Sequence, residues 1–305
     1  MIRRTVRGTD LGSSLPPAIV PAASSDIDLH CHSLASDGTL APGDVIAAAA
    51  AAGVRTLALT DHDTLAGLPS AAAAASRRGI RLISGVELSC RWEQRTVHVV
   101  GLGFDGGNEA LQRGLAELQA TRRARATRIA QKLEALGVAD ALERVQREAT
   151  DGQITRQHFA RLLIEDGLCR DTQRAFKRFL GRTGRAYVAA AWAPLPEVVA
   201  WIHGAGGCAA LAHPFAYRLS ASALGRLIGA FRDADGDALE VCCGTSRPAN
   251  VAHAAELARR HGLLGSVGSD FHDPAQPWRQ LGRLTPLPPS ITPVWTRFGI
   301  PRDPR

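Results

Sequence analysis

The sequence predicts an α/β fold in which about seven strands form a largely parallel sheet that can close into a barrel. Short apolar runs bounded by Gly, Asp or Ser alternate with helical stretches, which is typical of a parallel sheet. His, Asp and Glu residues accompany these runs, and one Arg-rich helical stretch interrupts the alternation. Since the common α/β barrel has eight strands, seven predict a barrel with one unit fewer.

The first barrel segment is predicted to be a β-α-β-α-β unit followed by a hairpin. Pro42 at the first turn and Gly53 after the last turn delimit a helix at 42–52, and Gly79 ends another at 65–78. A hairpin link is expected at 91–95. The strands are predicted at 27–30, 57–61, 82–87 and 97–102.

From residue 108 to about 181 the pattern is helical and Arg-rich, so we interpret this stretch as an insertion. Gly114 weakens a long helix at 109–136, and Thr155 is the expected N-cap of a helix at 155–165. Further helices are predicted at 171–180, 194–204, 221–233 and 248–261, and further strands at 208–213, 238–242 and 264–270. The predicted organisation is a loose extension at 1–25, a barrel at 26–105 and 185–285, a helical insertion at 106–184, and an irregular tail at 286–305.

Composition restricts the possible classes of function. The chain has 305 residues, 45% of them hydrophobic, and no apolar stretch suited to a membrane span or a secretory signal. Its six cysteines form no C-x-x-C pair, so we expect a reducing cytoplasm rather than a disulfide framework. The net charge of +7 fits a nucleic-acid or anionic substrate, but a general bias toward Arg and Ala explains it equally well.

Nine residues of metal-binding type lie at or near the predicted strands. Strand residues two positions apart point to the same face, and the carboxyl ends of barrel strands converge on one site. We therefore expect these side chains to meet although they are far apart in the sequence. They are His30, His32, Asp37, His62, Glu87, His98, His213, Asp270 and His272.

The ligand types indicate a hydrolytic centre with several ions. Imidazoles and carboxylates without thiolates suit Mn, Fe or Zn better than Ca, and nine ligands exceed the needs of one ion, so two or three ions are expected. Glu87 could bridge two of them. Clustered divalent ions activate water and neutralise a phosphoryl group, which predicts phosphoester hydrolysis. Taken singly, a buried His is usually structural, Asp37 could be a turn residue, and Asp61 and Asp63 could be caps or partners of ligands.

The motifs resemble those of the PHP (polymerase and histidinol phosphatase) family, over residues 26–285. The resemblance is strongest to its branch of nucleoside-3′,5′-bisphosphate phosphatases and 5′→3′ exoribonucleases, and all nine ligand positions are filled. It implies a distorted seven-stranded barrel, a trinuclear centre typically supported by Mn²⁺, and an inserted helical subdomain that grips the substrate's phosphate. The motifs are His30-Cys31-His32-Ser33, Ser36-Asp37-Gly38, Thr60-Asp61-His62-Asp63, Gly85-Val86-Glu87, His98, Ala212-His213-Pro214 and Gly268-Ser269-Asp270-Phe271-His272.

The insertion supplies the candidate substrate contacts. Arg156 and His158 match the branch's Arg-x-His-Phe-Ala element, and they can share a site only at a helix start because residues two apart face differently. Arg122 and Arg125, three apart on one helix, suit a second phosphate contact; the alternative is that all these arginines are solvated surface residues. Glu87 is expected in the catalytic centre, and the acid that protonates the leaving group is left open between His158 and His213.

The sequence thus predicts a cytoplasmic phosphoesterase that removes the 3′-phosphate of nucleoside 3′,5′-bisphosphates such as pAp. Release of 5′-mononucleotides from short 5′-phosphorylated RNA by the same chemistry is also expected. The substrate is the only partner implied; neither a membrane nor a stable protein partner is. Three alternatives are a histidinol-phosphate phosphatase, a non-enzymatic nucleic-acid-binding module, and an amidohydrolase, which the lack of a suitable strand Lys disfavours.

Overall fold

Seven strands form one sheet in chain order, as the sequence predicts. The computed structural model describes residues 25–149 and 152–302, so the predicted N-terminal extension lies outside it except for Ser25. Strand positions agree with the prediction, but β3 continues five residues beyond Glu87. The strands are β1 (Ile27–Asp28), β2 (Thr56–Leu59), β3 (Arg81–Trp92), β4 (Arg95–Leu102), β5 (Cys208–Leu211), β6 (Ala238–Cys243) and β7 (Leu264–Gly268).

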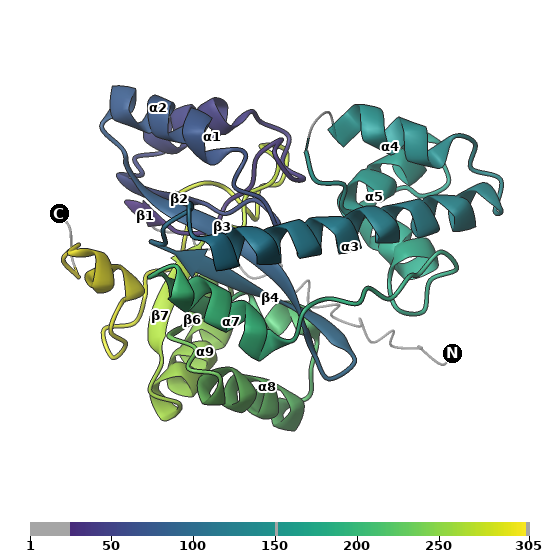
Figure 1. Cartoon of the computed structure of the whole chain (residues 1–305). Coiled ribbons are helices and arrows are strands. Elements are labelled where there is room, and N and C mark those ends of the chain that lie inside the picture. Colours follow the sequence, from purple (N-terminus) through teal and green to yellow (C-terminus); the bar gives the residue numbers. More distant parts are fainter. Residues whose placement is uncertain (1–24, 150–151, 303–305) are drawn as a thin grey trace, which may run out of the picture.

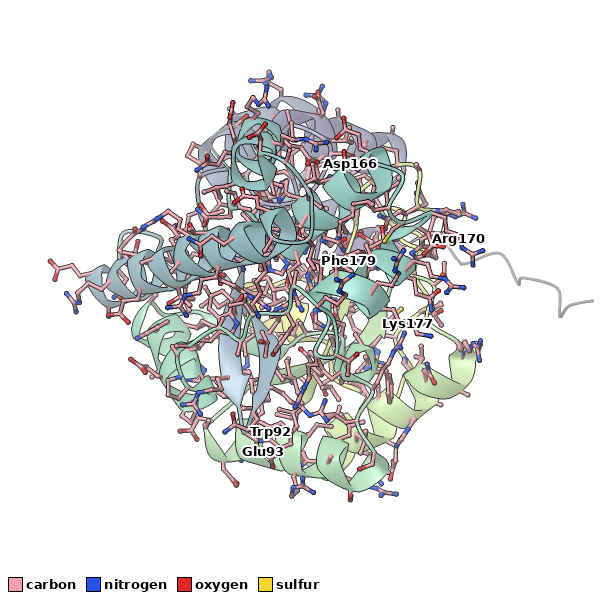
Figure 2. The ribbon with its side chains drawn as sticks, turned by 90° about the vertical axis from the view of Figure 1, so that its right-hand side faces the viewer. Trp92, Glu93, Asp166, Arg170, Lys177 and Phe179 are labelled. Atoms are coloured by element: carbon pink, nitrogen blue, oxygen red, sulfur yellow. The ribbon has the colours of Figure 1, made fainter. Side chains whose placement is uncertain are left out.

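One strand runs against the others. β1, β2 and β3 are mutually parallel, as are β5, β6 and β7, whereas β4 is antiparallel to both β3 and β5. The reason is the tight turn after Trp92, where Glu93 has a φ of 49°, because so short a link joins only antiparallel neighbours. Figure 2 labels this hairpin tip at Trp92 and Glu93.

Hydrogen bonds beyond the ends of β1 and β7 nearly close the sheet into a barrel. Leu29 N donates to Val267 O at 3.0 Å, Asp270 N to His30 O at 2.8 Å, and His32 N to Phe271 O at 2.8 Å. The first and last segments of the barrel are thereby held side by side. This pairing places the His30-x-His32 and Asp270-x-His272 motifs next to each other.

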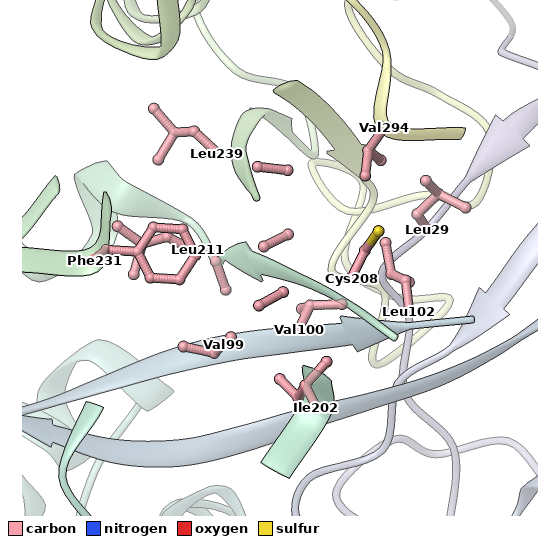
Figure 3. Packing of buried hydrophobic residues seen from close by; sticks show 14 of the residues in the cluster. Leu29, Val99, Val100, Leu102, Ile202, Cys208, Leu211, Phe231, Leu239 and Val294 are labelled. Carbon is pink, nitrogen blue, oxygen red and sulfur yellow. The ribbon is translucent and has the colours of Figure 1, made fainter. Parts of the chain in front are cut away.

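Five helices surround the barrel (Figure 1). Strand residues pack against Ile202 and Phe231 from two of them in the main hydrophobic core (Figure 3). The helix predicted at 65–78 begins later, at Leu68, because the preceding residues form a turn in which Leu68 N donates to Leu65 O at 3.0 Å. The helices are α1 (Pro42–Ala51), α2 (Leu68–Arg78), α7 (Leu195–Gly204), α8 (Ala221–Asp233) and α9 (Pro248–Arg260).

The inserted segment forms a helical unit with its own apolar core, which includes Leu133, Phe159 and Leu180. The long helix α3 runs from the barrel into this unit (Figure 1), and Figure 2 views the unit with Asp166, Arg170, Lys177 and Phe179 labelled. α4 was not predicted from the sequence, and the single helix predicted at 171–180 is instead a short α-helix that passes into a π-helix. The elements are α3 (Glu109–Glu134), α4 (Ala141–Ala149), α5 (Arg156–Glu165), α6 (Thr172–Ala175) and η1 (Phe176–Leu180).

The C-terminal segment is more ordered than the predicted irregular tail. Gly265 N of β7 donates to Thr292 O at 2.9 Å, and the segment then forms a 3₁₀-helix, η3 (Val294–Phe298). Trp295 and Ile291 are buried in the main core. Apolar anchoring therefore ties this segment to the barrel. In the part of the chain that the structure describes, no helix has the length and apolar character to cross a membrane.

A substitution at Gly114 can test how closely α3 packs on the barrel. A Cβ at this position would lie 2.5 Å from ring atoms of Trp201 on α7. We expect Gly114→Ala to lower the free energy of unfolding by about 1–2 kcal/mol in urea titrations, because overpacking outweighs the gain in helix propensity. Gly225→Ala in α8 is the matched control, since no neighbouring atom lies within 4 Å of its Cβ position. In the control, the free energy of unfolding should rise by about 0.5–1 kcal/mol. An equal rise in Gly114→Ala would contradict the close packing of α3 on α7.

Candidate active site

Glu87 lies at the centre of the candidate site, buried on β3. Its Oε2 atom is 3.3 Å from His30 Nε2, 3.2 Å from His32 Nε2 and 3.1 Å from His62 Nδ1. Its Oε1 atom is 2.9 Å from His98 Nδ1 and 2.8 Å from His213 Nε2. Burial opposes ionisation of Glu87, but the surrounding imidazoles outweigh it and hold the pKa of this carboxyl well below its usual range.

The neighbouring His30-x-His32 and Asp270-x-His272 motifs form a second part of the site. His30 and His32 share one face, as predicted, and their Nε2 atoms lie 3.1 Å apart. Asp270 Oδ1 lies 3.5 Å from His32 Nε2, and the rings of His32 and His272 stack with centroids 4.2 Å apart. The hydrogen bonds that close the barrel therefore bring these four residues together.

Asp37 joins the site from the loop that follows β1. Its Oδ1 lies 3.3 Å from His272 Nε2, and its Oδ2 lies 3.8 Å from His62 Nε2 and accepts a hydrogen bond from Thr155 Oγ1 at 2.9 Å. Burial opposes ionisation of Asp37, but its His neighbours keep the pKa of its carboxyl well below the usual value. The residue is thus buried among candidate ligands and linked to the insertion through Thr155.

His98 reaches the site from the reversed strand β4. It lies in the first half of this strand, opposite Ser89 of β3. The expectation that strand carboxyl ends converge does not apply to β4, because the amino-terminal half of an antiparallel strand faces the same end of the barrel. His213 follows β5 in a backbone conformation with φ 28° and ψ 61°, which is rare for a non-glycine residue.

The nine side chains are chemically suited to hold metal ions. Seven of them form three groups in which donor atoms lie within 4.8 Å of one another: His32, Asp37, His62 and His272; His30, His32 and Glu87; and His62, Glu87 and His98. The other two, His213 and Asp270, contact Glu87 and His32 from beside these groups. The buried Nδ1 atoms of His62, His98 and His213 form no hydrogen bond with the described residues, because those of His62 and His98, although close to Glu87, lack the required geometry. Buried polar atoms without partners are costly, and a metal ion would satisfy those that face it.

Two residues that the sequence motifs did not predict support this cluster. Glu240, buried on β6, accepts from His30 Nδ1 at 2.9 Å and from the backbone N–H of His213 at 2.5 Å. Arg279 reaches in from the loop after β7, with Nη2 2.7 Å from Asp270 Oδ2. A single charge within the apolar run of β6 was the available signal for Glu240, whereas nothing in the loop sequence marks Arg279.

Asp61 and Asp63 have the supporting role that the sequence left open. Asp61 accepts hydrogen bonds from Ser33 N at 2.7 Å, Ser33 Oγ at 2.6 Å and Ser36 Oγ at 2.7 Å, and so fixes the loop that carries the candidate ligand Asp37. Asp63 pairs with Arg122 of α3 and accepts from Ser89 N at 2.7 Å. Both carboxylates are therefore engaged in holding segments around the cluster.

A cavity of about 280 Å³ connects the cluster with the insertion. His62, Glu87, His98 and Asp270 are among the residues that line it on the barrel side. Arg122, Arg125, Arg156, Gln157 and Phe176 line it on the insertion side. Seven of the nine predicted metal ligands thus face the same cavity as three of the four predicted phosphate contacts, all except His158.

The three arginines of the insertion that line the cavity, Arg122, Arg125 and Arg156, differ in what they contact. Arg122 is engaged with Asp63 and donates to Ser89 Oγ at 2.9 Å, while Arg125 Nε donates to Val188 O at 3.1 Å. Burial, followed by repulsion from Arg156 and Arg122, lowers the pKa of Arg125 to about 9. Within residues 25–149 and 152–302, no carboxylate forms an ion pair with Arg125 or Arg156. Crowded, unneutralised guanidinium groups favour an anion between them.

His158 has a local structural role at the start of α5. Thr155 caps this helix as predicted, accepting from Gln157 N at 3.0 Å, and His158 Nδ1 accepts from Thr155 N at 3.0 Å in a capping box. His158 is buried and is not among the residues that line the cavity. Burial lowers its pKa to about 4. Its neighbour Arg156 faces the cavity, so the two residues of the predicted element are separated.

Known proteins are similar to this chain over about nine tenths of its length. The chain is 43% identical to a 5′-3′ exoribonuclease of Haemophilus influenzae (89% of this chain, 98% of the relative) and 43% identical to a 3′,5′-nucleoside bisphosphate phosphatase of Chromobacterium violaceum (89% and 95%). A solved structure described as an amidohydrolase from C. violaceum, with bound sulfate and no metal, superposes with a TM-score of 0.86 at 42% identity (90% and 96%). The PHP domain model matches residues 28–177. The fold expected from the sequence is therefore the one observed, and the chain belongs to the PHP family.

Proposed function

We propose that this protein is a phosphoesterase that hydrolyses the 3′-phosphate of nucleoside 3′,5′-bisphosphates and, by the same chemistry, releases 5′-mononucleotides from short 5′-phosphorylated RNA. The observation that carries the proposal is the single cavity with candidate metal ligands on one side and arginines on the other. Such a cavity suits a substrate with two phosphates. The names of the relatives from H. influenzae and C. violaceum support both activities.

The nine clustered residues are proposed to hold two or three ions, with Mn²⁺ as the first choice and Fe or Zn as alternatives. When bound, such ions supply Lewis-acid stabilisation of phosphoryl charge and lower the pKa of water. Glu87 presents both oxygens to surrounding imidazoles and is the proposed bridge between groups of ligands. Glu240 keeps the ring of His30 in place through its Nδ1 atom, which leaves Nε2 directed at the cluster.

The reaction consumes water. Its oxygen forms a bond to phosphorus, the bond between phosphorus and the 3′-oxygen breaks, and the electron pair stays on the 3′-oxygen, which takes up a proton. The products of a bisphosphate are inorganic phosphate and a nucleoside 5′-monophosphate. Arg156 and Arg125 are proposed to anchor the 5′-phosphate, with Arg122 fixed beside them by Asp63. Of the two histidines considered as the proton donor, His213 borders the cavity and His158 does not.

The division of labour extends to the domains. We propose that residues 26–105 and 185–285 form the hydrolytic barrel and that 106–184 bind the substrate. The insertion has an apolar core of its own from Ala126 onward, whereas the first half of α3 packs into the barrel core through Leu111, Leu115 and Leu118. An amidohydrolase with a carboxylated Lys is disfavoured, because both lysines of the chain, Lys132 and Lys177, lie in the insertion. The six free cysteines suit a cytoplasmic enzyme.

Metal dependence and substrate class can be tested together by phosphate release from pAp, 5′-AMP and histidinol phosphate. After chelation, we expect no release from any substrate, and after addition of Mn²⁺ release from pAp alone, because only pAp offers a 3′-phosphate with a 5′-phosphate for the arginines. His62→Ala should be inactive with Mn²⁺ present, since it removes a candidate ligand from two of the three donor groups. Hydrolysis of histidinol phosphate with pAp untouched would overturn the proposal.

Arg156 can be tested by comparing pAp with 3′-AMP, which carries the same scissile phosphate but no 5′-phosphate. Loss of a charged hydrogen bond costs about 1.5–3 kcal/mol. We therefore expect Arg156→Ala to lower kcat/KM for pAp by about tenfold or more and to change the value for 3′-AMP little. Arg174→Ala, at an exposed position on α6, is the matched control. Equal losses on both substrates in Arg156→Ala would contradict the assigned anchor.

His158 can be tested by a substitution that preserves the capping box. Gln is a regular partner in this box, so His158→Gln should keep kcat/KM for pAp, whereas His158→Ala should lose about 1 kcal/mol of stability. A loss of activity in His158→Gln as large as in His62→Ala would instead identify a catalytic role.

The pH dependence of stability gives a second readout for His158. Its pKa of about 4 lies below the unfolded value of about 6.5, so its contribution is present above the unfolded pKa and is lost as pH falls toward the folded one. Between pH 7 and pH 5, the free energy of unfolding, measured in urea, should therefore fall by about 1–2 kcal/mol less in His158→Gln than in the wild-type protein.

A further inference from the structure

A second hollow of about 150 Å³ opens beside the candidate active site. It shares His213, Ala216 and Arg279 with the main cavity, and all residues that line it belong to the barrel. The arginines of the insertion do not line the hollow, so it extends the site on a side that the proposed 5′-phosphate anchor does not use. Its other lining residues include Phe215, Asn250 and Ser246.

The two proposed substrates differ in what the scissile phosphorus carries. In a nucleoside bisphosphate, this phosphorus belongs to a terminal monoester. In RNA, the same phosphorus also carries the 5′-oxygen of the next nucleotide. With the 5′-phosphate held by the arginines and the scissile phosphorus at the nine-residue cluster, that second nucleotide needs space beyond the cluster.

We propose that the hollow is the binding subsite for this second nucleotide, the one on the 3′ side of the bond that is cut. The inference rests on the proposed function and specifies how the same site accepts a diester. At about 150 Å³, the hollow is smaller than the roughly 300 Å³ or more of a typical ligand pocket. It therefore fits one part of a substrate whose remainder lies in the main cavity.

The side chains around the hollow have the chemistry for this task. Phe215 is half-buried beside His253, with ring centroids 5.5 Å apart, and an aromatic face stacks on any nucleobase. Asn250, exposed on the first turn of α9, offers both an amide donor and an acceptor. Arg279 borders both cavities, and its contact with Asp270 leaves further N–H groups of the guanidinium for a phosphate oxygen.

The products explain why the subsite is needed for RNA only. Water adds to phosphorus, the bond to the 3′-oxygen of the first nucleotide breaks, and that oxygen takes up a proton. The first nucleotide leaves as a 5′-monophosphate, and the second keeps the phosphate as its new 5′-phosphate. For pAp, the corresponding product is inorganic phosphate, so the hollow has no occupant.

A blocking variant tests the subsite. In Asn250→Trp, the indole fills the hollow, while Ala252→Trp places the same ring on an exposed position of α9 that does not line it. With Mn²⁺, we expect Asn250→Trp to lower kcat/KM for the 5′-phosphorylated dinucleotide pApA at least tenfold and to leave pAp within twofold. Ala252→Trp should leave both unchanged. Phe215→Leu, which removes the aromatic face, should lower kcat/KM for pApA by about tenfold relative to kcat/KM for pAp.

The outcomes separate this inference from the proposed function. If Asn250→Trp and Phe215→Leu hydrolyse pApA as fast as the wild-type protein does, or lose pAp and pApA equally, the subsite assignment is overturned. If the wild-type protein hydrolyses pAp but not pApA, the subsite fails while the phosphatase proposal stands. If it hydrolyses neither substrate, the proposed function itself fails.

Discussion

One buried carboxylate organises the site. Glu87 contacts five imidazoles from four different segments of the barrel, three through Oε2 and two through Oε1. A carboxylate without partners in such a position would be strongly unfavourable, and so would the burial of several imidazoles around an apolar residue. The residues that supply those partners reach Glu87 only if the barrel closes. The chemistry of the centre and the topology of the sheet therefore depend on each other.

The barrel and the insertion contribute different kinds of specificity. The barrel supplies imidazoles and carboxylates, which suit metal ions and phosphoester chemistry in general. The insertion supplies Arg125 and Arg156, whose charges are not neutralised by carboxylates in the described part of the chain and therefore favour an anionic group. Such a division lets one hydrolytic centre serve different phosphoesters when the inserted segment changes. The hollow bordered by Phe215 and Asn250 adds a third, barrel-derived element, the proposed place of the second nucleotide of a diester.

Much of the fold could be predicted because its signals are local. Strand-like runs and helix boundaries such as Pro42 depend on neighbouring residues, and the PHP resemblance rests on short motifs. The sequence analysis failed where local signals were weak or misleading. It missed α4, a short polar helix that is held by packing in the insertion core. It also gave no role in the cluster to Glu240, because a lone charge on a buried strand has many explanations.

The sequence by itself determined which residue types are available and in what order, including the nine candidate ligands and the interruption of the barrel by a helical segment. Only the tertiary structure decided which of them face one another. The reversal of β4 presents His98 from the first half of its strand, and the capping box turns His158 away from the cavity while Arg156 faces it. The physical reason is that strand direction, helix capping and barrel closure fix the direction of a side chain through hydrogen bonds with residues far away in the sequence.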